Sequence, residues 1–174
     1  MPAGDVTRPF DAIERPEGFT YAYPIQLRLR DFDSQRNVNN AVYFTLAESG
    51  RIAYLEHVLG SEARGWVLAE ARCRYVHPVL MGERALTIFL RTERLGTSSL
   101  MVAFAMYSSS QERRVAEGDA VQVHVDRSAR PTPIPAAWHE RLTLFEREHG
   151  NPLPIAGDSA SDSERGKRGP KSYR

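Results

Sequence analysis

The chain has 174 residues, the size of one ordinary domain, and 41% of them are hydrophobic, which is enough to form a buried core. Its 23 basic and 22 acidic residues give a formal net charge of only +1, so the overall charge gives no reason to expect nucleic acid or a membrane as a partner. Because the single cysteine, Cys73, excludes an intramolecular disulfide and the first residues lack the apolar core of an export signal, we expect a cytoplasmic location.

The first predicted strand spans residues 23–30 and follows an N-terminal extension, residues 1–19. Ile25, Leu27 and Leu29 alternate here with polar and basic residues. A period of two is typical of a strand with one buried face. We therefore expect a half-buried strand whose exposed face is basic.

A long helix is predicted next. Residues 31–40 are rich in Asp and Asn, which favour turns and helix caps, so the helix should begin at Asn39 or Asn40. Residues 41–59 lack proline and carry apolar side chains on most helical faces, which indicates that other elements wrap this helix. Gly60 is a suitable end, since glycine readily adopts the left-handed conformation found after helices.

Four more strands are predicted from alternating apolar and polar residues, at residues 66–77, 85–94, 99–109 and 113–125. The breaks between them are short, which suits antiparallel connections. One five-stranded antiparallel sheet curled around the apolar helix would explain that helix's composition. The expected class is therefore α+β, in a single domain at residues 20–155.

The C-terminal part is predicted to contain one more helix and then a tail. Trp138, Leu142 and Phe145 have the i, i+4, i+7 spacing of one helical face. Residues 156–174 have scarcely an apolar residue and are expected to be disordered, because burial cannot offset their ordering entropy.

The order of elements and several motifs resemble the 4-hydroxybenzoyl-CoA thioesterase-like family of the hotdog fold. Residues 30–51 read RDFDSQRNVNNAVYFTLAESGR. The family's usual form is Asp-x-Asp, then His-Val-Asn-Asn, then an aromatic residue and Glu-x-x-Arg on the helix. The similarity continues through RYVHPVLMGE at residues 74–83 and covers residues 20–145 in order. It implies an acyl-CoA thioesterase that assembles as a homodimer or homotetramer.

The resemblance also implies the site. Asp33 matches the catalytic carboxylate, which would act either as a general base or as a nucleophile through a mixed anhydride. Asn40 falls where the helix begins, so its backbone N–H would be a free donor for the thioester oxygen. The chain departs from the pattern at Arg36-Asn37, where many members have Gly-His. Asn37 cannot carry a proton near neutral pH, although its amide can orient water or substrate.

Further contacts to substrate are expected from polar and aromatic residues at Asn37, Asn39, Tyr43, Glu48, Arg94 and Ser99. Glu48 more simply pairs with Arg51 at i, i+3, and it ranks after Asp33 as a catalytic carboxylate. Arginines such as Arg94 suit the phosphates of coenzyme A.

We expect no metal and no cofactor, because the five histidines show no pair at metal-ligand spacing. Two other functions stay open. One is a hotdog hydratase or dehydratase, which typically needs a histidine and a carboxylate at the helix start, a pair that Asn37 leaves unmade. The other is a non-catalytic module that binds acyl-CoA.

Overall fold

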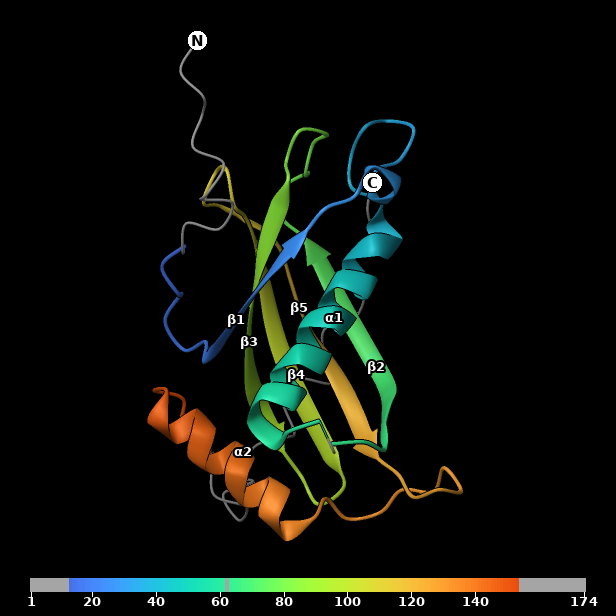
Figure 1. The fold of residues 1–174 in the computed structure, drawn as a ribbon, viewed down its shortest axis with the longest axis vertical. Helices are drawn as coiled ribbons and strands as arrows, with labels where there is room; N and C mark the ends of the chain where they lie inside the picture. The colour runs from blue at the N-terminus through green and yellow to red at the C-terminus, as the bar shows by residue number, and fades with distance from the viewer. Residues whose placement is uncertain (1–12, 62, 154–174) are drawn as a thin grey trace, which may run out of the picture.

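The computed structural model describes residues 13–61 and 63–153 (Figure 1). The predicted tail, residues 156–174, and residues 1–12 of the expected N-terminal extension lie outside the described residues. In the described part, five strands form one antiparallel sheet in the order β1-β3-β4-β5-β2. The elements are β1 (Tyr21–Gln26), the 3₁₀ helix η1 (Leu29–Asp31), α1 (Asn40–Leu59), β2 (Trp66–Tyr75), β3 (Ala85–Leu95), β4 (Ser99–Ser108), β5 (Arg114–His124) and α2 (Ala136–Glu148). The α+β prediction and the five strands are confirmed.

The long helix α1 lies along one face of the sheet (Figure 1). It begins as predicted, with the Asn39 side chain accepting the Ala41 N–H at 2.9 Å, and it ends at Gly60, whose φ is 88°. Gly50 permits close packing, since a Cβ there would lie 3.3 Å from side-chain carbons of Ile88 and Leu90 on β3. The face toward the sheet buries Tyr43, Leu46, Ala47, Gly50, Arg51, Tyr54, Leu55, Val58 and Leu59.

The other side of α1 is uncovered within one chain. Phe44 is 40% exposed and Ile52 is 51% exposed, although both are large and apolar. The sheet therefore covers α1 on one side only. The apolar residues on the outer side of α1 are the reason why its sequence predicted wrapping on most sides. In the described part of the chain, neither helix is long and apolar enough to span a membrane.

The predicted first strand is too long at its C-terminal end. Backbone pairing to β3 ends at Gln26, and Leu29 is 79% exposed in η1. The cause is local: the Asp31 carboxylate accepts the Arg28 N–H at 2.7 Å, and the Arg28 carbonyl accepts the Asp31 N–H at 2.9 Å. These two bonds close a turn where the apolar alternation alone favours a strand.

The second helix, α2, packs across the end of the molecule near α1 and β3 (Figure 1). Its predicted apolar face is confirmed, since Leu142 is fully buried and both Trp138 and Phe145 pack against the core. Sequence reasoning did not find that Glu146, on the same helix, is also fully buried.

Glu146 joins α2 to the sheet and to α1. Its Oε1 accepts hydrogen bonds from the Tyr54 hydroxyl at 2.5 Å, the Thr20 hydroxyl at 2.9 Å and the Thr92 N–H at 2.9 Å. Its Oε2 accepts from Asn151 Nδ2 at 2.5 Å. Burial raises the pKa of Tyr54 well above its usual value, and the nearby Glu146 carboxylate raises it further, so the hydroxyl stays a donor. The four hydrogen bonds satisfy the buried carboxylate and hold α2 against α1 and the sheet.

Candidate active site

A cavity of about 450 Å³ opens where the polar turn, the start of α1 and the end of β2 meet. The turn contributes Asp33 and Asn37, and the first turn of α1 contributes Asn40 and Tyr43. These are four of the residues expected from the sequence. The end of β2 and the residues after it add Tyr75 and His77. The cavity therefore collects residues from segments that are far apart in the sequence.

The backbone holds the Asp33 carboxylate in place. Its Oδ1 accepts the N–H groups of Gln35 at 2.8 Å and Asn37 at 3.0 Å, and the Asp33 N–H donates to the Asn37 carbonyl at 2.8 Å. Arg36 takes a φ of 66°, which closes the turn between them. Within the described chain, Oδ2 has no hydrogen-bond partner. One carboxylate oxygen thus orients the group, and the other is free for chemistry.

The Asn40 N–H, at the same cavity, is a donor without a partner among the described residues. The next two amides of the helix are bonded, Ala41 to Asn39 Oδ1 at 2.9 Å and Val42 to the Asn39 carbonyl at 2.9 Å. No acceptor among the described residues takes the Asn40 N–H. An N–H at a helix N-terminus carries a partial positive charge and is suited to bind an oxyanion.

Two tyrosines form the wall of the cavity next to Asn40. The Tyr75 hydroxyl donates to the Asn40 carbonyl at 3.0 Å, and the rings of Tyr43 and Tyr75 meet edge to face at 5.1 Å. Burial is the main cause that raises the pKa of Tyr43 to about 12, with smaller contributions from Cys73 and Tyr75. Burial also raises the pKa of Tyr75. Both hydroxyls are therefore protonated near neutral pH and serve as hydrogen-bond donors.

The structure does not bring the other expected contact residues to this cavity. The Asn39 side chain is occupied in capping α1. Glu48 is exposed on α1, and among the described residues it makes no ion pair within 4 Å. Its predicted pairing with Arg51 is therefore not a direct contact. The Arg51 guanidinium is instead buried at 3% exposure with its Nε unpaired, and burial lowers its pKa, although the charge of Glu48 acts to raise that pKa.

Arg94 and Ser99 lie at the other end of the sheet. Ser99 pairs with Val123, whereas the cavity end of β2, at Tyr75, pairs with Ala116. Arg94 pairs with Met101 on the neighbouring strand. Within one chain these residues are therefore separated from the cavity by most of a strand's length.

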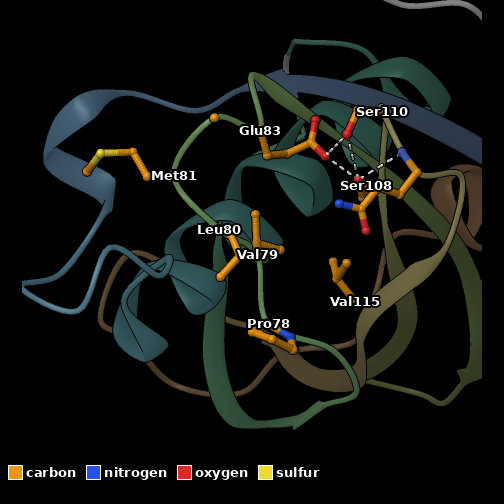
Figure 2. A pocket seen from close by; sticks show the side chains of 10 residues that line it. Pro78, Val79, Leu80, Met81, Glu83, Ser108, Ser110 and Val115 are labelled. Atoms are coloured by element: carbon orange, nitrogen blue, oxygen red, sulfur yellow. Dashed lines mark hydrogen bonds between the residues drawn. The ribbon is translucent and has the colours of Figure 1, made fainter.

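A second, smaller cavity of about 250 Å³ is lined by the segment that follows β2 and by residues of β4 and β5, and Figure 2 shows its lining. The two cavities share Pro78 and Val79. Glu83 lines the smaller cavity. Its carboxylate accepts hydrogen bonds from the hydroxyls of Ser108 and Ser110, the latter at 2.6 Å (Figure 2). These bonds fix the end of the segment to β4.

Sequence reasoning missed two polar residues of this site, Tyr75 and His77. Of the two, His77 carries the imidazole, the side chain that ordinarily exchanges a proton most readily. It lies two residues past the end of β2, immediately before Pro78, and its side chain is exposed at the cavity. The sequence gives one signal for it, the position of His77 within the RYVHPVLMGE segment of the resemblance. Across residues 13–61 and 63–153, no group of three His, Cys, Asp or Glu side chains is arranged to hold a metal ion.

The family model that matches this chain is described as the thioesterase-like superfamily, and it matches residues 27–142. Its range includes every residue of the cavity. The chain is also 31% identical to a thioesterase from Thermus thermophilus that was solved with coenzyme A and zinc. The two structures superpose with a TM-score of 0.69, over 76% of this chain and 98% of the other.

Two further relatives also carry the name thioesterase. The chain is 28% identical to a putative acyl-CoA thioesterase from Xanthomonas campestris, with a TM-score of 0.56 over 63% of this chain and 95% of the other. It is 21% identical to a chloroplastic acyl-acyl carrier protein thioesterase of Arabidopsis thaliana, over 76% of this chain and 73% of that protein. The chain therefore belongs to the thioesterase-like superfamily, and its structural relatives are hotdog-fold thioesterases.

Proposed function

We propose that this protein hydrolyses an acyl-CoA thioester to the free acid and coenzyme A, with Asp33 as general base or nucleophile. One observation carries the proposal: the free Oδ2 of Asp33 and the free N–H of Asn40 belong to residues that line the same cavity. Thioester hydrolysis needs these two groups, one to attack the carbonyl or activate water and one to hold the developing oxyanion.

The reaction follows from those positions. Asp33 either takes a proton from water as the water oxygen attacks the thioester carbon, or attacks that carbon itself. In both cases the carbonyl oxygen gains negative charge, and the Asn40 N–H stabilises it. Collapse of the tetrahedral intermediate breaks the C–S bond and releases the coenzyme A thiolate. The hydroxyls of Tyr43 and Tyr75 border the cavity: the Tyr75 hydroxyl donates to the Asn40 carbonyl, and the Tyr43 hydroxyl would position substrate or water.

Coenzyme A is proposed as the carrier because the T. thermophilus thioesterase, with which this chain shares 31% identity, was solved with coenzyme A. The cytoplasmic location expected from Cys73 stays a prediction.

We also propose that the protein works as a homodimer or homotetramer in which two β2 strands pair. In the part of the chain that the structure describes, β2 is an edge strand, since it pairs with β5 alone. Its apolar residues Val67, Leu68 and Tyr75 are 49%, 46% and 44% exposed. An unpaired, apolar edge strand is a template for pairing with another chain. Twofold symmetry makes that pairing antiparallel. Val67 of one subunit would then lie near the C-terminal end of β2 in the other subunit, the end that borders the cavity.

The experiment is free-thiol release from a panel of acyl-CoA substrates, aromatic and aliphatic, followed colorimetrically. Thiol release in proportion to enzyme supports the proposal. Hydration of an enoyl-CoA without thiol release would instead identify a hydratase, for which the presence of both His77 and Asp33 at the cavity is the favourable observation. Tight binding of acyl-CoA without either reaction would identify a binding module.

A further inference from the structure

We propose that His77 is a second catalytic residue of this site, the general base that activates water to cleave an acyl group carried on Asp33. This inference rests on the proposed function and takes its nucleophilic form. His77 and Asp33 line the same cavity although they come from different segments, the residues after β2 and the turn before α1. His77 is exposed to solvent at this cavity, so water reaches it.

The segment that carries His77 is held on both flanks. Before Pro78, the Val115 carbonyl of β5 accepts the N–H groups of Val76 at 2.8 Å and His77 at 3.1 Å. After Pro78, the segment is fixed to the turn that carries Asp33, because the Val79 carbonyl accepts the Val38 N–H at 2.9 Å. These bonds fix the backbone of His77 relative to the turn that carries Asp33. A rigid backbone is part of the support that a catalytic group requires.

The remaining ionisable groups of the cavity cannot serve as this base. From α1 comes Tyr43, whose pKa burial raises to about 12, and from β2 comes Tyr75, whose pKa burial also raises. From the turn comes Asp33, and β5 meets the His77 backbone through the Val115 carbonyl. Imidazole is the side chain that ordinarily exchanges a proton near neutral pH. His77 is therefore the group at the cavity that suits general base catalysis.

The need for a second base follows from the chemistry. When the Oδ2 of Asp33 attacks the thioester carbon, a C–O bond forms, the C–S bond breaks, and coenzyme A leaves as a thiolate. Asp33 is then acylated and cannot accept a proton. His77 removes a proton from water as the water oxygen attacks the anhydride carbonyl, and the Asp33 carboxylate leaves. The departed thiolate takes a proton from solvent and His77 returns its proton to solvent, so one water is consumed and free acid and thiol are formed.

The test is a burst experiment on His77→Gln, with His139→Gln on α2 as the matched control, since His139 is half-buried and lies outside the cavity. With His77→Gln, we expect rapid release of one thiol per subunit, followed by turnover slowed roughly 10²-fold, the lower end for loss of a positioned base. Hydroxylamine should capture the acyl group, and free imidazole should restore turnover. His139→Gln should behave as wild type.

The outcomes separate the two proposals. Wild-type protein that releases no thiol from any acyl-CoA would refute the proposed function, and the role of His77 would fall with it. Active wild type with an unchanged His77→Gln rate would refute the role of His77 alone. So would a slowed His77→Gln that shows no burst, because a residue that only supports the structure slows both steps together. The double variant with Asp33→Asn must lose the burst, since it has no nucleophile.

Discussion

Replacing Asn40 with proline removes the proposed oxyanion donor and little else. Proline lacks the backbone N–H, and Asn40 is the first residue of α1, the helical position that proline favours. Residue 39, which would precede the proline, already has φ −61° and ψ 136°, the extended conformation that a following proline requires. The Asn39 cap on Ala41 does not involve the Asn40 N–H. We therefore expect Asn40→Pro to fold and assemble as wild type does.

The expected loss of kcat follows from the number of backbone N–H groups at the start of α1 that lack an acceptor among the described residues. The Ala41 and Val42 amides are already bonded, so neither replaces the lost Asn40 N–H. Loss of one oxyanion donor lowers kcat by roughly 10²–10³-fold, about 2.7–4 kcal/mol of transition-state stabilisation. The free energy of unfolding should change by less than about 1 kcal/mol, the size of a proline substitution at a compatible position.

The assay is steady-state thiol release together with urea unfolding of the same preparations. Asn40→Ala is the control, because it removes the side chain and keeps the N–H, and its kcat should stay close to wild type. Equal losses of kcat in both variants would assign the effect to the side chain. A fully active, folded Asn40→Pro would refute the oxyanion role of this amide.

Three other predictions concern assembly, the buried carboxylate and the cysteine. Val67→Lys with Leu68→Lys should convert the assembled protein to monomers, as measured by sedimentation. Leu144→Lys, at an exposed apolar position of α2, should leave the assembly unchanged. A monomeric wild type would contradict the proposed pairing. Glu146→Gln should lower the free energy of unfolding in urea by roughly 1–3 kcal/mol, because the glutamine NH2 that replaces Oε2 cannot accept the hydrogen bond from Asn151. Exposed Glu140→Gln should change it little. Burial raises the pKa of Cys73 from 9.0 to about 11, so the folded thiol stays protonated until the pH approaches that value. At pH 8, the folded protein should therefore react with a thiol reagent on the order of 10² times more slowly than the protein unfolded in urea. Equal rates would refute the burial of Cys73.

The fold was largely predictable because its elements carry strong periodic signals. The ends of α1 depend on local chemistry, a capping Asn39 and a glycine at position 60, and the structure has both. β1 was predicted too long because the alternation runs on through Leu29, while the side-chain bond from Asp31 turns the backbone. Apolar spacing contains no information about that competing bond.

The site was partly predictable for a similar reason. Asp33, Asn37, Asn40 and Tyr43 lie within eleven residues of one another, so one motif places them together. His77 comes from a distant segment, and its position depends on how β2 pairs with β5. Glu146 was missed because a charged residue on a helix is ordinarily exposed, and three of its four partners come from distant parts of the chain.

The most direct test of the account is kcat for Asp33→Asn, measured with the Kd of the same variant for a thioether analogue of its substrate. Asparagine keeps the size of the side chain and one carbonyl oxygen to accept the Gln35 and Asn37 amides, but removes the negative charge. The account predicts that kcat falls roughly 10²–10⁴-fold, the range for a positioned acid or base, while Kd stays within a few-fold of wild type. A folded Asp33→Asn protein with near wild-type kcat would contradict it.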